Sequence, residues 1–251
     1  MILRNELVRD VSAFFPCYND ELAIPLMVRD VHRALRESVE DFEIIVVDDG
    51  SRDGSVGVLR RLQCEIPELR VVEHETNRGY GGALLSGFAA TTRTWVFYTD
   101  GDAQYRASEL TRCIDAVTPG IDVVQGYKLG RGDAWYRKLI GRAYHHAVRL
   151  LFNLRVRDTD CDFRLIKREL VERVELKSTS GVICVEMMRK FRVAGARFAE
   201  VGVSHHPRPH GRSQFFRLPA IARSIRQLMA LWWTLVVRDR FRSAVGPGRV
   251  R

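Results

Sequence analysis

Two short acidic motifs contain the residues of this chain best suited to chemistry. Asp48 and Asp49 follow the apolar run 44–47, and Asp100 and Asp102 come shortly after the apolar run 95–98. Carboxylates held one residue apart are hard oxygen ligands for Mg2+ or Mn2+, and such a metal usually keeps open positions for phosphate oxygens. The motifs therefore predict a site for a nucleoside diphosphate.

Strands must place both motifs. β-branched and aromatic runs that end at carboxylates and glycine are typical of buried strands. We expect strands at 11–16, 44–47, 70–73 and 95–98, with helices between them at 22–39, 51–63 and 81–91. This alternation predicts an α/β fold with a mostly parallel sheet and right-handed crossovers. Ligands of such sheets bind at the carboxyl ends of strands, so both motifs are expected to border one cleft.

The second half of the chain continues the pattern less regularly. We expect strands at 122–125 and 199–203, and helices at 108–117, 135–152, 169–173, 185–193 and from 218 onward. Residues 1–215 are predicted to form one domain, followed by an amphipathic, basic helix and tail at 216–251.

The last helix is expected to carry an apolar face. On a helical wheel this face comprises Ile221, Ile225, Leu228, Met229, Trp232, Leu235 and Val236. Its apolar core is too short to cross a bilayer. It is suited to lying in a membrane interface, and packing against the domain or a partner protein is the alternative.

Composition narrows the class of partner. The 251 residues have a formal net charge of +9, which favours an anionic partner. Nucleic acid is not expected, because the chain lacks a helix-turn-helix pattern, zinc-finger spacing and an aromatic RNA-binding signature. The five cysteines are scattered and the amino terminus lacks a signal-like apolar stretch, so we expect a cytoplasmic protein.

Several motifs, taken in order, give the chain a resemblance to a known family. They are Phe15-Pro-Cys-Tyr-Asn-Asp20, Asp48-Asp-Gly-Ser51, Asn77-Arg-Gly-Tyr-Gly-Gly-Ala83, Asp100-Gly-Asp-Ala-Gln104, Asp162-Phe-Arg-Leu-Ile-Lys-Arg168 and Arg208-Pro-His-Gly-Arg-Ser213. Together they resemble the family-2 glycosyltransferases of GT-A fold, and within these the dolichyl- and polyprenyl-phosphate sugar synthases. The resemblance runs from about 11 to 215.

The resemblance implies roles for particular residues. Those expected to bind the nucleotide-sugar are Pro16, Tyr18, Asp20, Val47, Asp49, Asp100, Arg208 and Ser213. Those expected in the sphere of Mg2+ or Mn2+ are Asp100, Asp102 and Gln104, and those near the acceptor phosphate are Arg137, Arg142 and Arg164. Asp102, Asp162, Arg164 and Arg208 are the catalytic candidates. Two departures from the family pattern are Gln214, where relatives carry lysine, and Asp162, where they carry a small residue.

The implied reaction is inverting transfer of a sugar from a nucleotide-diphosphate sugar to a polyprenyl phosphate on the cytoplasmic face of a membrane. An ionised phosphate needs no general base. The first alternative is transfer to the hydroxyl of a soluble saccharide or small molecule, which needs a carboxylate base such as Asp160, Asp162 or Glu186. The second is an inactive protein that binds nucleotide-sugar and recruits a membrane protein. The sequence does not indicate which sugar and which nucleobase the donor carries.

Overall fold

The computed structural model describes residues 5–129, 145–208 and 218–238, with only the backbone for 218–222. A seven-stranded sheet with the order β3-β2-β1-β4-β6-β5-β7 lies at its centre. The strands are β1 (Asp10–Cys17), β2 (Asp41–Asp48), β3 (Leu69–Glu73), β4 (Trp95–Thr99), β5 (Val123–Leu129), β6 (Phe163–Lys167) and β7 (Phe198–Ser204). All neighbours pair in parallel except β6, which is antiparallel to β4 and β5. The predicted mostly parallel α/β sheet is confirmed.

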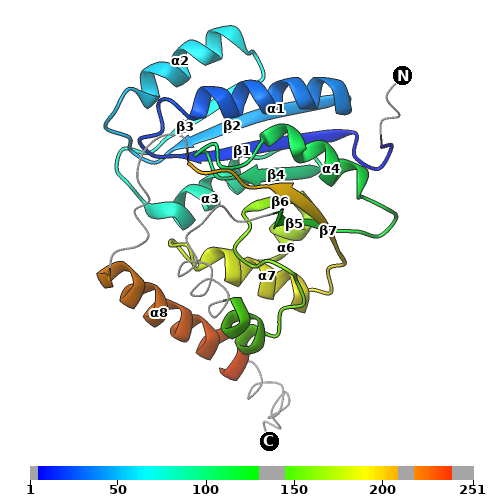
Figure 1. Ribbon diagram of the computed structural model, residues 1–251, viewed down its shortest axis with the longest axis vertical. Helices are drawn as coiled ribbons and strands as arrows, with labels where there is room; N and C mark the ends of the chain where they lie inside the picture. Colours follow the sequence, from blue (N-terminus) through cyan, green and yellow to red (C-terminus); the bar gives the residue numbers. More distant parts are fainter. Residues whose placement is uncertain (1–4, 130–144, 209–217, 239–251) are drawn as a thin grey trace, which may run out of the picture.

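Helices cover both faces of the sheet (Figure 1). On one face lie α1 (Ile24–Ser38), α2 (Ser55–Glu65) and α4 (Leu110–Asp115), which follows the short turn η1 (Ala107–Glu109). On the other lie α3 (Gly79–Ala90), α6 (Arg168–Arg173) and α7 (Ile183–Val193). This arrangement explains why β1, β2 and β4 read as continuous apolar runs, since strands covered on both faces have no solvent side.

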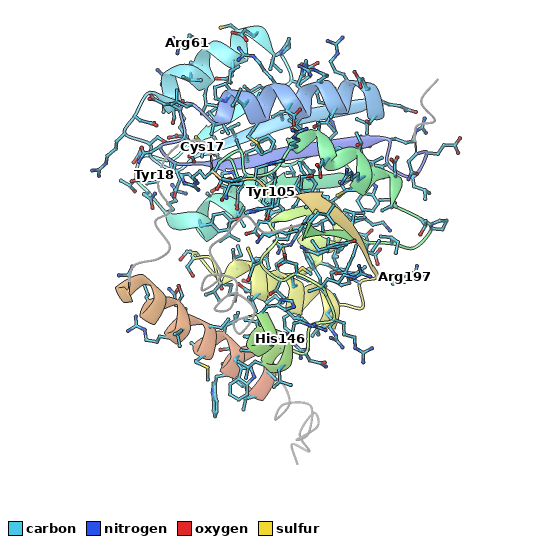
Figure 2. All side chains as sticks on the ribbon, viewed as in Figure 1. Cys17, Tyr18, Arg61, Tyr105, His146 and Arg197 are labelled. Atoms are coloured by element: carbon cyan, nitrogen blue, oxygen red, sulfur yellow. The ribbon has the colours of Figure 1, made fainter. Side chains whose placement is uncertain are left out.

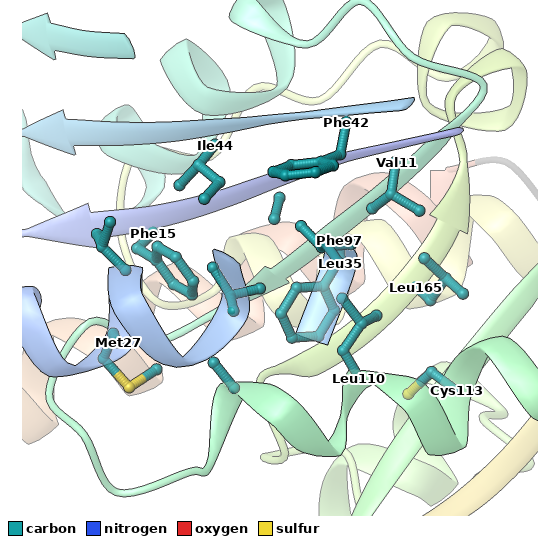
Figure 3. Close-up of a cluster of buried hydrophobic side chains, with 14 of the residues drawn as sticks. Val11, Phe15, Met27, Leu35, Phe42, Ile44, Phe97, Leu110, Cys113 and Leu165 are labelled. Atoms are coloured by element: carbon teal, nitrogen blue, oxygen red, sulfur yellow. The ribbon is translucent and has the colours of Figure 1, made fainter. Parts of the chain in front are cut away.

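Neighbouring side chains along each strand enter different cores. Phe15 packs towards α1 and Phe14 packs towards α3, because successive side chains of a strand point to opposite faces. Figure 3 shows the first core, where Phe15 and Phe97 meet Leu35 and Leu110 from the covering helices. The two cores fix the register of the strands, so the position at which each strand stops is fixed as well.

A third cluster attaches the last helix. Residues 145–152 are helical, and Val148 and Phe152 pack with Leu228 of α8 (Leu218–Trp232), which continues as a π-helical turn at Trp233–Arg238. The Trp232 indole N–H donates to the Leu151 carbonyl oxygen at 3.0 Å. α8 lies at the end of the molecule opposite α2 (Figure 1). Within the part of the chain described, no helix has both the length and the hydropathy to cross a bilayer.

The apolar residues expected on one face of α8 are divided between two environments. Leu228 and Val236 are buried, whereas Ile225 is 57% exposed and Met229 is 45% exposed. The packed side of the helix is therefore narrower than the helical wheel indicates, and an apolar stripe is left outside.

The strand β6 was not expected from the sequence. It inserts antiparallel between β4 and β5, so its first residue, Phe163, lies beside Thr99 at the end of β4. The beginning of β6 and the carboxyl ends of β1, β2 and β4 therefore border the same edge of the sheet. Figure 2 marks this edge at Cys17 and Tyr18, with Arg197, which precedes β7, on the opposite side.

Candidate active site

The second acidic motif forms a tight loop directly after β4. A Cβ at Gly101 would lie 2.4 Å from the Pro16 carbonyl oxygen, so only glycine lets the loop pass this close to the end of β1. Asp102 is 5% exposed, and its Oδ1 accepts a hydrogen bond from the Gln104 backbone N–H at 3.0 Å. The expected metal-sphere residues Asp100, Asp102 and Gln104 therefore lie in one loop at the carboxyl edge.

Asp100 is held from the side by a tyrosine. The Tyr80 hydroxyl donates to Asp100 Oδ1 at 2.7 Å. Burial raises the pKa of Asp100, and the nearby carboxylates of Asp162 and Asp102 raise it further. Asp100, Asp102 and Asp162 therefore lie near one another in a poorly solvated place, where a cation would be stabilising.

Arg208 supplies a cation to this loop. Its Nη2 donates to Asp102 Oδ2 at 2.6 Å. Burial by itself would lower the pKa of Arg208, but Asp102 and Asp20 raise it overall. The segment before it is held by Gln104, which exchanges two hydrogen bonds with His206: its carbonyl oxygen accepts from the His206 N–H at 2.8 Å, and its side-chain amide donates to the His206 carbonyl at 3.1 Å. Arg208 therefore occupies one oxygen of a predicted metal ligand.

The carboxylate of Asp49 faces inward. It accepts hydrogen bonds from the backbone N–H groups of Arg78 at 2.8 Å and Gly79 at 3.0 Å, at the start of α3. Its third partner is His74 Nδ1 at 2.7 Å, and His74 Nε2 lies 2.8 Å from Ser86 Oγ. Asp49 was expected to contact the nucleotide, but here three groups of the protein surround it. It fastens the beginning of α3 to the end of β2.

The neighbouring Asp48 faces a different environment. Asp48 is 2% exposed, and its Oδ2 accepts a hydrogen bond from the Ser51 N–H at 3.1 Å. Its Oδ1 is buried and has no hydrogen-bond partner among the described residues. A buried carboxylate oxygen without a donor is costly, so this oxygen marks a place where a ligand N–H or O–H would be stabilising.

The remaining residues expected to contact the nucleotide differ in exposure. Tyr18, directly after β1, is 37% exposed. Burial raises the pKa of Asp20 to about 6 against the attraction of Arg208, which lowers it. The Val47 side chain is fully buried in the core under α3, so it points away from this edge.

Arg164 is fully buried within the protein. Its Nε donates to Gln125 Oε1 at 2.6 Å, its Nη1 to Asp162 Oδ1 at 2.6 Å and to the Tyr98 hydroxyl, and its Nη2 to the Thr159 carbonyl at 3.2 Å. Its relative exposure is 0%. The expected contact between Arg164 and an acceptor phosphate would require these hydrogen bonds to break. In this structure the guanidinium forms an ion pair with Asp162 instead.

Glu186, a candidate general base, is bonded within the protein. Glu186 is 2% exposed, and its carboxylate accepts from the backbone N–H groups of Lys177 and Ser178 and from Lys190 Nζ at 2.6 Å. Burial would raise the pKa of Glu186, but these hydrogen bonds lower it, which makes the group a poor base. Arg137, Arg142 and Ser213 lie outside the described residues.

The two acidic loops meet at the first turn of α3. That turn gives backbone N–H groups to Asp49 and the Tyr80 hydroxyl to Asp100. Sequence reasoning missed Tyr80, His74, Tyr98 and Gln125 as parts of the site. Only Tyr80 carried a signal, since it stands within the glycine-rich motif 77–83 that the resemblance singled out.

The donor atoms of the second loop fit a hard divalent cation. Asp100 and Asp102 offer carboxylate oxygens, and the Arg208 guanidinium shows that a positive group is accommodated beside Asp102. Among the residues described, no three His, Cys, Asp or Glu side chains are grouped to hold a metal. The predicted set has two carboxylates and an amide, which leaves ligand positions for a substrate.

With this geometry established, comparisons with known proteins identify the family. The sequence profile of glycosyl transferase family 2 matches residues 12–175. This span contains most of β1, the strands β2 to β6 and both acidic loops. The chain therefore belongs to glycosyl transferase family 2.

Curated relatives are similar over most of this chain. One is the undecaprenyl-phosphate 4-deoxy-4-formamido-L-arabinose transferase of Aeromonas hydrophila subsp. hydrophila, 27% identical over 85% of this chain and 65% of its own length. Another carries the same name in Pseudomonas paraeruginosa and is 31% identical over 82% of this chain and 60% of its own length. The chain thus spans less than two thirds of these relatives.

Solved structures support the fold. The glucosyl-3-phosphoglycerate synthase of Mycobacterium tuberculosis, crystallised with Mn2+, uridine diphosphate and glucosyl-3-phosphoglycerate, superposes with a TM-score of 0.70 and 21% identity, covering 91% of this chain and 80% of the other. The same enzyme with Mn2+, UDP-glucose and phosphoglyceric acid gives a TM-score of 0.68 at 19% identity, with 91% and 80% covered. At this level of identity the likeness concerns the fold.

Proposed function

We propose that this chain transfers a sugar from a nucleoside-diphosphate sugar to a polyprenyl phosphate. The observation that carries the proposal is the loop at the end of β4, where Asp100 and Asp102 lie together and Arg208 already neutralises Asp102. Membership of glycosyl transferase family 2 and the undecaprenyl-phosphate transferases among the relatives support it.

The nucleotide is proposed to bind between the ends of β1 and β2. Asp48 Oδ1 is the buried acceptor that needs a donor, and a nucleobase N–H provides one. Tyr18, exposed at the same edge, offers a ring face for stacking. Asp48 thereby takes the role that the sequence assigned to Asp49, whose oxygens are used within the protein.

Mg2+ or Mn2+ is proposed to be held by Asp100 and Asp102, with Gln104 nearby. The ion would supply electrostatic stabilisation of the charge that develops on the leaving diphosphate. The structures of the Mycobacterium tuberculosis enzyme with Mn2+ support this choice of ion. Arg208 is the protein group suited to the same charge, because its planar guanidinium binds phosphate oxygens bidentately.

The acceptor side is proposed to receive an anion. Asp162 would repel a phosphate, but its pairing with Arg164 at 2.6 Å cancels its charge. A phosphate monoester is largely ionised near neutrality and attacks without a general base. The Asp162–Arg164 pair is therefore compatible with a lipid phosphate acceptor.

The testing experiment is a transfer assay with two types of acceptor. The protein would be incubated with Mn2+ and a panel of sugar nucleotides, with undecaprenyl phosphate in one set and soluble sugars and phosphoglyceric acid in the other. We expect a sugar-linked lipid from one donor and no soluble product. Product only with a hydroxyl acceptor would overturn the lipid assignment, and donor binding without any turnover would support an inactive binding protein.

Asp162 gives a second candidate function a specific basis. Among the described residues only Oδ1 of Asp162 is bonded, to Arg164 and to the Cys184 thiol at 3.0 Å, and the side chain is 17% exposed. A free carboxylate oxygen at this place is able to accept a proton from an acceptor hydroxyl. Replacing Asp162 by Asn should abolish transfer to a hydroxyl and leave transfer to a phosphate largely intact.

We further propose that the exposed stripe of the last helix contacts anionic lipid. Ile225, Met229 and Trp233, at 57%, 45% and 59% exposure, are each four residues apart and so share a face. Arg223 and Arg226 are exposed on the same helix, where they can meet anionic headgroups. This surface would bring the catalytic edge to its lipid substrate at the cytoplasmic face.

Vesicle sedimentation tests the stripe. Vesicles containing phosphatidylglycerol should retain the protein, and retention should fall when Ile225, Met229 and Trp233 are replaced by Ser. Leu26→Ser is the matched control, since Leu26 is 56% exposed on α1, away from α8. Equal retention of both variants would exclude the stripe as the membrane contact.

A further inference from the structure

A tyrosine in the glycine-rich turn of α3 is bonded to a predicted metal ligand. The Tyr80 hydroxyl lies 2.7 Å from Asp100 Oδ1. We propose that Tyr80 is a positioning residue that sets the orientation of the Asp100 carboxylate for divalent cation binding. The inference rests on the proposed function, since it assumes that Asp100 is a metal ligand.

The direction of the hydrogen bond follows from the chemistry of both groups. An ionised carboxylate only accepts hydrogen bonds, so the phenol must donate. One oxygen of Asp100 is thereby occupied, and of the two oxygens Oδ2 is the one left for a cation by the residues that the structure describes.

Asp100 requires such a restraint because its neighbours are acidic. Asp102 lies two residues further along the same loop, so the like charges of the two carboxylates tend to separate them before a cation binds. A donor fixed on one side of Asp100 opposes that displacement. Groups that hydrogen-bond to metal ligands generally act in this way, by fixing the orientation of the ligand before the metal binds.

The backbone around Tyr80 is fixed on two sides. Asp49 accepts hydrogen bonds from the N–H groups of Arg78 and Gly79, immediately before Tyr80. On the other side, the Gly81 N–H donates to the Thr179 carbonyl at 3.0 Å.

The glycines make this position possible. Gly79 has a φ of +82°, a conformation that other residues rarely adopt. A Cβ on Gly81 would lie 2.4 Å from the Ser178 carbonyl oxygen, so the turn lies directly against residues 178–180. The glycine-rich motif therefore places the Tyr80 phenol against Asp100. The backbone N–H groups of Arg78, Gly79 and Gly81 donate to acceptors within the protein.

Mn2+ binding, followed by electron paramagnetic resonance without nucleotide, tests the role of Tyr80. Tyr80→Phe keeps the ring and removes only the donor, and we expect Mn2+ affinity to fall about 10-fold, the lower end for groups that orient metal ligands. Tyr127→Phe is the matched control. Tyr127 belongs to β5, and its ring lies under the Arg157 guanidinium, so the substitution removes a phenol that has a different partner. The control should bind Mn2+ as the wild type does.

Three outcomes separate this inference from the proposed function. A wild type without Mn2+ binding would remove the metal site itself. A wild type that binds Mn2+, with a Tyr80→Phe variant of equal affinity, would overturn only the role of Tyr80. A second measurement adds Tyr80→Phe to the Asp100→Asn variant. If Tyr80 acts through Asp100, the second substitution should cause no further loss of Mn2+ affinity. A further loss as large as in the wild-type background would show that Tyr80 acts through the fold. Thermal unfolding without metal identifies folded variants.

Discussion

The two acidic loops leave the same edge of the sheet, yet the protein uses their carboxylates differently. Asp49 is bonded to two backbone N–H groups and to His74, all within the fold. Asp102 is bonded to the side chain of Arg208, which comes from the segment after β7. Backbone donors cannot leave without unfolding a helix turn, whereas a side-chain cation can be exchanged for another cation. Asp49 is therefore a structural acid, whereas Asp102 is the acid for which we propose a function.

The same contrast appears within a single motif. Asp48 and Asp49 are adjacent, but successive side chains at a strand end point in opposite directions. Asp49 turns to α3, and Asp48 keeps one buried oxygen without a partner among the described residues. The two acids of this motif therefore differ: Asp49 is bonded within the protein, and Asp48 is the one that we propose binds a ligand.

Loss of the exchangeable acid should have the largest effect. Asp102→Asn should lower sugar transfer about 1000-fold, in the range seen when a group that stabilises transition-state charge is removed. Its free energy of unfolding should change little, because Arg208 remains partly exposed. Initial rates with saturating donor measure the effect. The control is Asp115→Asn, an exposed acid on α4, and a comparable loss in that variant would contradict the assignment.

Loss of the structural acid should act on stability instead. Asp49→Ala leaves two backbone N–H groups at the start of α3 and the buried His74 without their acceptor, which should cost about 3 kcal/mol of the free energy of unfolding. Urea denaturation measures it. If Asp49→Ala were as stable as the wild type but unable to bind nucleotide, the comparison would be reversed.

Asp48 should affect nucleotide affinity. Replacing Asp48 by Ala removes the unpartnered buried acceptor, and we expect nucleoside diphosphate to bind about 10-fold more weakly, as for a lost hydrogen bond to a charged group. Calorimetric titration with uridine and guanosine diphosphates would also indicate which base is preferred. Unchanged affinity for both would exclude Asp48 as the base contact.

Arg208 should compete with the metal when no nucleotide is present. Arg208→Gln removes the cation that lies 2.6 Å from Asp102, so Mn2+ should bind about fivefold more tightly, equivalent to about 1 kcal/mol for a partly exposed ion pair. Nucleoside diphosphate should bind more weakly in the same variant. Weaker Mn2+ binding would mean that Arg208 supports the metal ligands rather than competing for them.

Asp20 predicts the smallest effect, a pH dependence. Burial raises the pKa of Asp20 from 3.8 to about 6, so folding favours the protonated form. The stability this adds is complete below pH 3.8 and is lost as the pH rises through about 6. The free energy of unfolding of Asp20→Asn should therefore rise relative to that of the wild type as the pH increases from 3.8 to about 6. The rise should be less than about 1 kcal/mol because solvent screens a partly exposed group. Urea denaturation at both pH values measures it, and a constant difference would contradict the titration.

The sequence was informative where local pattern and burial agree. The apolar runs of β1, β2 and β4, each stopped by acids or a turn, predicted strands at nearly the observed positions and placed the acids at the carboxyl edge. The strand β6 was missed although its residues were recognised as a motif. Its five residues contain Arg164 and Lys167, so neither alternation nor an apolar run is clear.

The tertiary structure alone decided what each charged group touches. Arg164 looked like a phosphate ligand, but β6 carries it into the interior, where Asp162 and Gln125 surround it. The choice between Asp48 and Asp49, and the pairing of Tyr80 with Asp100, likewise depend on where α3 begins relative to the sheet. The amino-acid order determined which acids end the strands, because hydrophobic periodicity is local. The partners of those acids come from distant segments, and only packing brings these together.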